Sequence, residues 1–348
     1  MKILYPFVAV LGLMLIAYLG VQIGLAPVFG IVFPYLALLI FIVGFINKVV
    51  DWGKSPVPFR IPTTCGQEAS LPWIKQNKID CPSTTKGVLA RMFFEVVLFR
   101  SLFRNTRASV YEGPKLRYGS SKYLWLFALL FHYSFFIIVV RHMRLFTDPM
   151  PFFVPILEFF DGILQIGAPN LYLADLVIIG ALLFLFLRRI LLPAIKYISL
   201  PADYFPLFLI FAIALTGILM RYFIRVDVVS IKKLAVGLAT LSPSITGEIG
   251  SIFYIHLFLV CALLVYFPFS KLMHLGGVFL SPTRNLANNN RMVRHINPWN
   301  DPSIKPHSYA GYEDDFREFM AGAGLPLEKE LPAAEETPAD DESAAEKE

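Results

Sequence analysis

The chain has 348 residues, of which 56% are apolar and only 16% are charged, and its formal net charge is +5. A water-soluble globular protein has roughly a quarter of its residues charged. The composition therefore excludes that class and indicates that lipid surrounds most of the chain. The basic residues lie in loops beside apolar segments, not on a basic face with interleaved aromatic residues, so we expect lipid contact and no nucleic-acid binding.

Six apolar segments have about the 20 residues that a helix needs to cross a bilayer. They are Ile3–Gly24, Val28–Ile46, Tyr123–Val140, Leu171–Leu187, Tyr204–Phe223 and Ile249–Phe269. The first lacks a small-residue cleavage motif and leads directly into the second, which favours a tight helical hairpin over a cleaved signal peptide. The sequence thus predicts an all-α integral membrane protein with about six transmembrane helices.

Lysine and arginine gather in one long loop. Asp51–Lys122 contains twelve of them, so the positive-inside rule places this loop in the cytoplasm. Six spans then put both termini in the cytoplasm, in a multi-pass protein of the cell inner membrane. Four basic residues disagree because this topology places them outside: Arg221, Arg225, Lys232 and Lys233.

The predicted organisation has five parts. A transmembrane hairpin (residues 1–50) precedes the basic cytoplasmic loop (51–122) and a four-helix unit (123–280). A cytoplasmic polar tail (281–312) follows. The last part (313–348) is acidic, with a net charge of −10, and becomes rich in Pro, Ala and Glu, so we expect it to be disordered.

Two loops on the predicted outer side are unusually apolar. Thr147–Asn170 has too many prolines to span and many aromatic residues, which predicts a lid at the membrane interface. Val228–Leu241 has the pattern of a short amphipathic interfacial helix. On the cytoplasmic side, Cys65 and Cys81 lack CxxC spacing, so we expect thiols without a metal role.

The six histidines form two groups. His295 and His307 lie in the polar tail, where a solvated side chain is the simplest expectation. The other four lie on two spans: His132 and His142 on the third, and His256 and His274 on or just beyond the last. Because a polar side chain at membrane depth is costly, these four are functional candidates.

Opposite helix directions define how these four histidines pair. The third span runs outward and the last runs inward, so His132 meets His274 near the cytoplasmic side, and His142 meets His256 near the outer side. A bis-histidine pair suits a haem that only exchanges electrons, and the spans lack the carboxylates of a zinc or di-iron centre. The sequence predicts two b haems stacked inside the helix bundle. In straight helices the spacings correspond to about 15 Å and 27 Å, a mismatch that we expect helix tilt and a distortion at Pro268 to absorb.

The histidine spacing, with nine residues between the first pair and seventeen between the second, resembles that of the nitrate reductase gamma-subunit family of dihaem cytochromes b. Within it, the stretches Arg60–Lys75, Phe99–Thr106 and Phe131–Phe146 are similar to DsrM-type cytochrome b subunits of DsrMKJOP complexes, which are associated with sulfite reduction. The resemblance covers about residues 1–302.

The resemblance implies two haem b cofactors and menaquinol as the substrate, oxidised near the outer haem. It further implies that electrons pass through the inner haem to a cytoplasmic iron–sulfur partner resembling heterodisulfide reductase. Other membrane and periplasmic cytochrome or iron–sulfur subunits belong to such complexes.

Four charged residues near His142 are candidates for the quinol site. Arg141 and Arg144 flank it and are suited to pair with a haem propionate or a quinone oxygen; the alternative is that they extend to lipid headgroups. Glu158 and Asp161 are candidate proton acceptors; the alternative is that they are solvated carboxylates. Two other functions stay open at this point, a haem-free transporter and a structural anchor subunit, and both predict no b-type haem spectrum.

Overall fold

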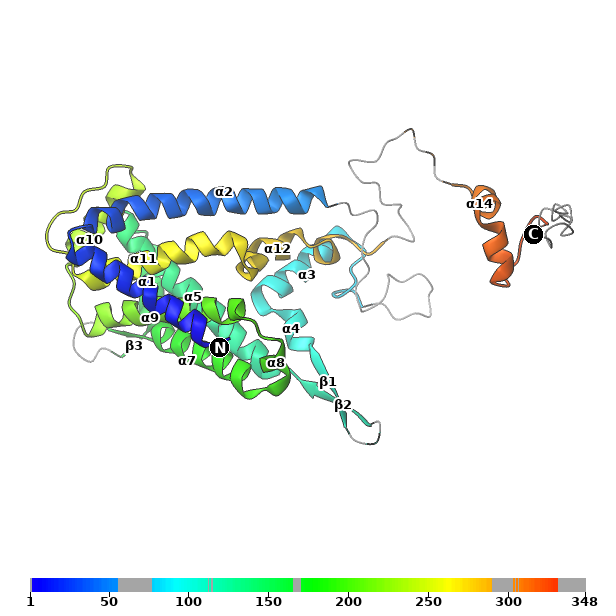
Figure 1. The fold of residues 1–348 in the computed structure, drawn as a ribbon, viewed down its shortest axis with the longest axis horizontal. Coiled ribbons are helices and arrows are strands. Elements are labelled where there is room, and N and C mark those ends of the chain that lie inside the picture. Colours follow the sequence, from blue (N-terminus) through cyan, green and yellow to red (C-terminus); the bar gives the residue numbers. More distant parts are fainter. Residues whose placement is uncertain are drawn as a thin grey trace, which may run out of the picture. The chain divides into compact units, whose positions relative to one another are not determined.

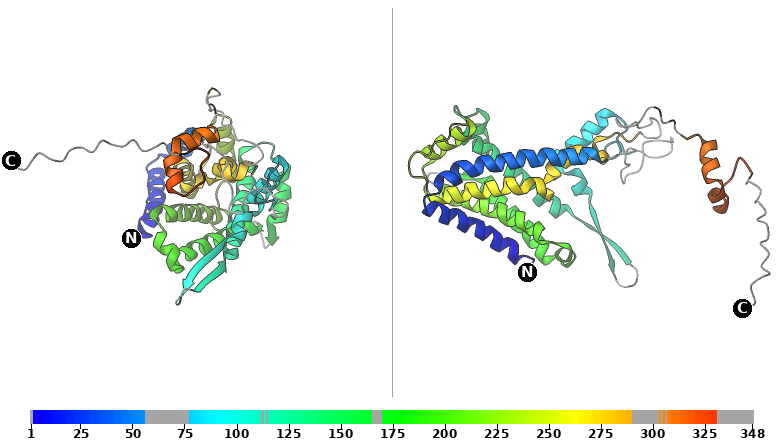
Figure 2. Two further views of the ribbon diagram at one scale, coloured as in Figure 1. Left: turned by 90° about the vertical axis from the view of Figure 1, so that its right-hand side faces the viewer. Right: turned by 45° about the horizontal axis from the view of Figure 1, so that its top comes forward.

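The structure is a computed structural model. It describes residues 2–55, 77–111, 113, 115–164, 170–289, 303, 305 and 307–330. The chain forms two units, residues 1–295 and residues 296–348. The first unit holds a bundle of long helices (Figures 1 and 2) and all four histidines of the predicted pairs.

Five helices of the described chain are long and apolar enough to cross a membrane, which confirms five of the six predicted spans. They are α1 (Leu4–Gln22), the π-helical turn η1 (Val28–Val32) continued by α2 (Phe33–Lys54), α5 (Lys122–Phe146), α9 (Pro201–Tyr222), and α11 (Ser251–Tyr266) continued by the short helix η2 (Phe267–Phe269). The chain turns at Gly24, whose φ is +88°, between α1 and α2. The two helices do not pack along each other as a tight hairpin would, because each packs on α11.

The remaining predicted span, Leu171–Leu187, is displaced in the structure. Its first two residues form the short strand β4 (Leu171–Tyr172), and helix α7 runs from Leu173 to Leu191. Helix α7 packs against α5 and α9, but it carries Asp175 in its first turn and two arginines in its last turn. With three charges in 19 residues, α7 has no 18-residue stretch with two or fewer charges, as each of the five apolar helices has, so a sixth crossing stays a prediction.

Helix α11 lies at the centre of the bundle, in contact with α1, α2 and α9. Its Leu259 is fully buried against Val10 of α1 and Leu209 of α9. A second cluster joins Ile178 and Leu182 of α7 to Ile210 of α9. These contacts hold together the helices that carry the histidines.

The predicted cytoplasmic loop contains regular structure, and it shows that the all-α prediction was incomplete. After α2 it forms α3 (Thr85–Leu98) and α4 (Arg100–Arg104), joined by Phe99 in the left-handed conformation with φ +49°. Strands β1 (Thr106–Tyr111) and β2 (Lys115–Ser120) then pair as an antiparallel hairpin. Cys81 is buried, whereas Cys65 lies outside the described residues.

The predicted lid and interfacial helix lie at the other end of the bundle (Figure 1). The lid contains α6 (Phe153–Asp161) and β3 (Gly162–Leu164), which pairs with β4. Helix α10 (Val228–Ala239) follows α9, and its Leu234 is fully buried in a cluster with Phe29 and Tyr254. A short helix therefore forms where it was predicted, and part of its apolar face packs on the protein. Its position at the membrane interface stays a prediction.

The chain does not continue as one helix from His256 to His274. Helix α11 ends at Tyr266, and two 3-10 turns follow, η2 and η3 (Lys271–Met273), before α12 (His274–Leu280). The predicted distortion at Pro268 is confirmed, and the straight-helix spacing of about 27 Å does not apply. The remaining short helices are α8 (Pro193–Ile198) and α13 (Pro282–Asn285).

The second unit contains helix α14 (Tyr309–Gly322), so the prediction of disorder from residue 313 onward was wrong for this part. The buried carboxylate of Glu313 accepts hydrogen bonds from the backbone N–H groups of Glu328 and Lys329, at 2.9 and 2.8 Å. This contact folds the chain back on the helix. Residues 331–348 lie outside the described residues.

Candidate functional site

The structure brings together both predicted histidine pairs. The ring centres of His132 and His274 are 5.9 Å apart with their planes at 79°, and those of His142 and His256 are 6.4 Å apart with their planes at 9°. Each pair joins α5 to the last part of the bundle: His256 lies on α11, and His274 begins α12.

All four imidazoles have one nitrogen engaged in a hydrogen bond. Nδ1 of His132 and of His142 lies 2.7 Å from the carbonyl oxygen four residues earlier, and Nδ1 of His274 lies 2.8 Å from that of Lys271. Nδ1 of His256 lies 2.9 Å from the hydroxyl oxygen of Thr216. A carbonyl can only accept, so Nδ1 carries the proton in the first three, and in each the lone pair is left on Nε2.

This geometry fits a metal held between two imidazoles. With a metal–nitrogen bond of about 2 Å, two opposed histidines have ring centres roughly 6 Å apart, close to both observed distances. A hydrogen bond from the second ring nitrogen is the usual support for a ligating histidine. Among the described residues no group of three or more His, Cys, Asp or Glu side chains is close enough to hold a metal ion. A haem needs only two protein ligands because its macrocycle supplies the other iron ligands, and each pair offers two imidazoles at a suitable distance.

The His132–His274 pair adjoins the predicted cytoplasmic segments. The ring of Phe99, between α3 and α4, meets His132 edge-on at 5.0 Å. Trp125 and Tyr133 of α5 hydrogen-bond to carbonyls at the end of α3, at 2.7 and 3.0 Å. The ammonium group of Lys271, the residue that accepts from His274, lies 2.7 Å from Asp203. Helices α3, α4 and α9 thus all help to position this pair.

Two stretches of the first unit from the predicted cytoplasmic side, residues 77–122 and 281–289, contact each other. Arg284 of α13 forms an ion pair with the buried Glu95 of α3 at 2.7 Å, and the N–H of Asn288 donates to the carbonyl of Pro82 at 2.6 Å. Helix α13, at the start of the polar tail, therefore packs on α3.

Arg144 and Glu158 lie near the other pair. Helix α5 carries Arg144 two residues after His142, and its guanidinium forms a 2.7 Å ion pair with Glu158 of the lid helix α6. The side chain of Arg144 is 42% exposed. This pair links the lid to the helix that carries His142.

Arg141 occupies a buried charge network and does not extend to lipid headgroups. Its guanidinium contacts Asp161 of the lid at 2.7 Å and Asp175 of α7 at 2.6 Å, and it stacks on the ring of Tyr172 at 3.8 Å. Burial raises the pKa of Asp161, opposed by the N–H of Ala174 and by Arg141. Arg141 therefore links the lid to α7 through its two ion pairs.

Arg221 and Tyr222 of α9 complete this network. The guanidinium of Arg221 also lies over the Tyr172 ring, 4.1 Å from the ring centre. The hydroxyl of Tyr222 donates to Asp175 at 2.9 Å. The nearby Lys232 pairs with Asp148 at 3.4 Å. Two of the four basic residues that disagreed with the predicted topology thus have local partners.

Sequence reasoning missed Thr216, Asp175 and Tyr172. Asp175 carried a usable signal, because a carboxylate at the start of an apolar span needs a partner. Thr216 and Tyr172 carried none, since both residue types are common in and around membrane helices. Of the two tail histidines, His307 is exposed and lies 3.5 Å from Asp315, and His295 lies outside the described residues.

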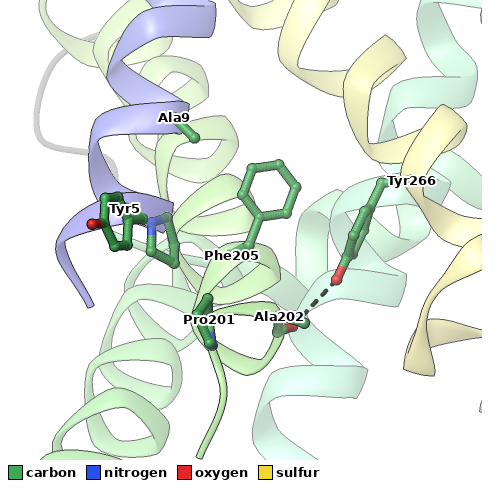
Figure 3. A pocket seen from close by; sticks show the side chains of 7 residues that line it. Tyr5, Ala9, Pro201, Ala202, Phe205 and Tyr266 are labelled. Atoms are coloured by element: carbon green, nitrogen blue, oxygen red, sulfur yellow. Dashed lines mark hydrogen bonds between the residues drawn. The ribbon is translucent and has the colours of Figure 1, made fainter. Parts of the chain in front are cut away.

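A separate pocket of about 300 Å³ lies between the starts of α1 and α9 and the end of α11 (Figure 3). It is lined by Tyr5, Pro6, Ala9, Pro201, Ala202, Phe205 and Tyr266. Tyr266 donates to the carbonyl of Ala202 at 3.2 Å. The lining includes none of the paired histidines or the lid charges, so this pocket is not part of the candidate site.

The fold and the site define a class: a helical membrane protein whose bundle presents two stacked pairs of histidines. Residues 105–295 match the family described as nitrate reductase gamma subunit, and the chain belongs to that family. It is 44% identical over 286 residues to the "Hdr-like menaquinol oxidoreductase cytochrome b-like subunit" of Archaeoglobus fulgidus, covering 80% of this chain and 85% of that protein. The protein of the same name from Archaeoglobus profundus is 44% identical over 277 residues, covering 78% and 82%.

Proposed function

We propose that this protein is the membrane cytochrome b subunit of a respiratory complex. It passes electrons between menaquinol and a cytoplasmic iron–sulfur partner by way of two bis-histidine b haems. The observation that carries the proposal is the double cross-pairing of histidines, each ring held by a hydrogen bond at Nδ1. Menaquinol is supported by the printed name of the two relatives.

Four side chains would hold the two haems. His132 and His274 would ligate the inner haem, and His142 and His256 the outer one. A haem with two histidine ligands has no open iron position and supplies one-electron transfer without binding a substrate at the metal. The protein's part is to fix the rings, which the four Nδ1 hydrogen bonds do.

We place the quinol site under the lid, near His142. Arg144 is suited to contact a quinol oxygen because it is always charged and half-exposed, and Glu158 beside it can accept a proton. Arg141 contributes by holding Asp161 and thus the lid. This site lies at the end of the bundle opposite α3 and α4, consistent with proton release to the outside.

We place the iron–sulfur partner on the surface formed by α3, α4 and α13. This surface adjoins His132 through Phe99. The loop Asp51–Lys122, to which α3 and α4 belong, has twelve Lys and Arg residues, and such a basic loop favours an acidic partner and steers its approach. The fold of the partner (one resembling heterodisulfide reductase), a role in sulfite reduction, and further membrane and periplasmic subunits follow from the family resemblance. Six spans, with both termini in the cytoplasm, complete the proposal.

Two rival functions make an opposite prediction. A haem-free transporter or a structural anchor leaves the paired histidines without a role, and neither gives a reduced-minus-oxidised b-type haem spectrum. We expect that spectrum from the purified protein.

The partner assignment is tested by purification from the native membrane, followed by addition of menaquinol. We expect the chain to co-purify with an iron–sulfur subunit whose clusters become reduced. A chain that purifies alone, or a partner that binds at the lid end and is reduced from there, contradicts the proposed direction of transfer.

A further inference from the structure

His256 differs from the other paired histidines in the partner of its Nδ1 atom. His132, His142 and His274 each bond to a backbone carbonyl three or four residues earlier. His256 instead contacts the hydroxyl of Thr216, forty residues away on α9, at 2.9 Å. The orientation of this imidazole therefore depends on a second helix.

The hydroxyl hydrogen of Thr216 is already committed. Its Oγ1 lies 2.8 Å from the carbonyl oxygen of Ala212 and 3.0 Å from that of Ile213, and the residue is 2% exposed. Since a carbonyl only accepts, the hydroxyl donates to α9 and turns a lone pair toward His256. The Nδ1 atom of His256 must then be the donor. Because hydrogen bonds in a chain polarise one another, the Thr216 hydroxyl accepts this bond more strongly while it donates to α9.

Gly217, the next residue of α9, lies beside the His256 ring. A Cβ atom at this position would lie 3.4 Å from Cε1 of His256, at about van der Waals contact. One residue of α9 thus hydrogen-bonds to the ring, and the next lies beside it. The ring planes of His142 and His256 are within 9° of each other, whereas those of His132 and His274 differ by 79°.

We propose that Thr216 is the positioning residue of the His142–His256 centre: it fixes the tautomer and ring plane of His256 and sets the redox potential of the haem held there. This inference rests on the proposed function. Donation from Nδ1 into an acceptor increases electron density on the imidazole, which favours oxidised iron and lowers the potential.

The test is a redox titration of the Thr216→Val chain, which keeps the side-chain shape and removes the hydroxyl acceptor but leaves the carbonyl of Ile213 near the imidazole. Loss of a hydrogen bond to a metal-ligating histidine typically changes metal affinity or activity by 10-fold or more. We expect the oxidised-to-reduced ratio of the outer haem, at fixed potential, to fall about tenfold, which is a rise of ~59 mV for a one-electron couple. The inner haem should keep its potential. The ferric spin-resonance signal of the outer haem should also change, because it depends on the angle between the ligand planes.

Two further chains make the result specific. Thr216→Ser keeps the hydroxyl and should keep the wild-type potential and signal. Ser134→Ala is the matched control: Ser134 is buried, and its hydroxyl donates to the carbonyls of Leu130 and Phe131, as Thr216 does on α9. It should leave both haems unchanged. Thr216→Ala is measured in parallel, so that the test can still be made if the Thr216→Val protein does not fold or insert into the membrane.

The inference is overturned if the Val and Ala chains keep both potentials and both signals. It is equally overturned if the Ser chain shifts as far as the Val chain, because the hydroxyl is then not responsible. Selective loss of the outer haem from the Val chain supports the inference. A wild-type protein without two b-type components overturns the proposed function instead, so the two failures are distinguishable.

Discussion

Arg141 and Arg144 lie three residues apart on α5, but their surroundings differ. Arg141 is 7% exposed and bridges two buried aspartates, Asp161 and Asp175. Arg144 is half-exposed and has one partner, Glu158. We therefore expect Arg141 to contribute mainly to the stability of the fold and Arg144 mainly to the reaction with quinol.

The first prediction compares Arg141→Ala with Arg144→Ala. Removing one partner of a buried ion pair leaves uncompensated charge and costs about 3–5 kcal/mol, so the Arg141 variant should lose that much unfolding free energy. The Arg144 variant should lose less than ~1 kcal/mol, as expected for an exposed pair, but reduce the outer haem more slowly with menaquinol. Unfolding of the detergent-solubilised protein and stopped-flow reduction measure the two effects. Equal loss of stability, or an unchanged reduction rate in the Arg144 variant at full haem content, contradicts the assignment.

At the residue scale the sequence predicted the groups that are rare at membrane depth. The four histidines stood out because a polar ring in an apolar span needs a reason, and opposite helix directions predicted which of them meet. The partners of Arg141 were not predictable in the same way. Asp161 and Asp175 lie 20 and 34 residues away along the chain, and only the packing of the lid on α7 brings them together.

The break between α11 and α12 depends on a close approach from α2. Pro268 lies in η2, and a Cβ atom added at Gly44 would lie 2.8 Å from Cβ of Pro268. A proline ring cannot move aside as a long flexible side chain can. Glycine at position 44 therefore permits the geometry that presents His274 to His132.

The second prediction is that Gly44→Ala displaces η2 and weakens the His132–His274 haem selectively. The redox titration should show a smaller inner component and an unchanged outer one. Gly12→Ala in α1 is the control, because an added Cβ there meets no atom within 4 Å. If the Gly44 and Gly12 chains behave alike, the close approach has no influence on this centre.

At the element scale, apolar length was a sufficient signal for the long helices and a poor one elsewhere. The hairpin of β1 and β2 lies in a loop where twelve basic residues mask any alternation of polar and apolar side chains. The acidic composition after residue 313 predicted disorder, but the contact of Glu313 with two backbone N–H groups stabilises α14. Long-range contacts of this kind are not visible in composition.

The third prediction concerns the orientation of the whole molecule. In a chain whose own cysteines are replaced, Ser109→Cys in the β1–β2 hairpin and Ser343→Cys in the tail should resist a membrane-impermeant thiol reagent added from outside. Thr240→Cys is the control, because Thr240 is exposed at the end of α10 near the lid, and it should react. Labelling of Cys at position 343 or 109 in intact cells contradicts the positive-inside topology.

The central claim is that two haems are held by the crossed histidine pairs, and redox titration of the four single His→Ala chains tests it most directly. Replacing His142 or His256 should remove one spectroscopic component, the same one in both chains. Replacing His132 or His274 should remove the other, because the two pairs meet at different levels of α5, with ring centres 6.4 Å apart for His142–His256 and 5.9 Å apart for His132–His274. Loss of one common component from the His132 and His256 chains, or a wild-type protein without b-type haem, would contradict the account.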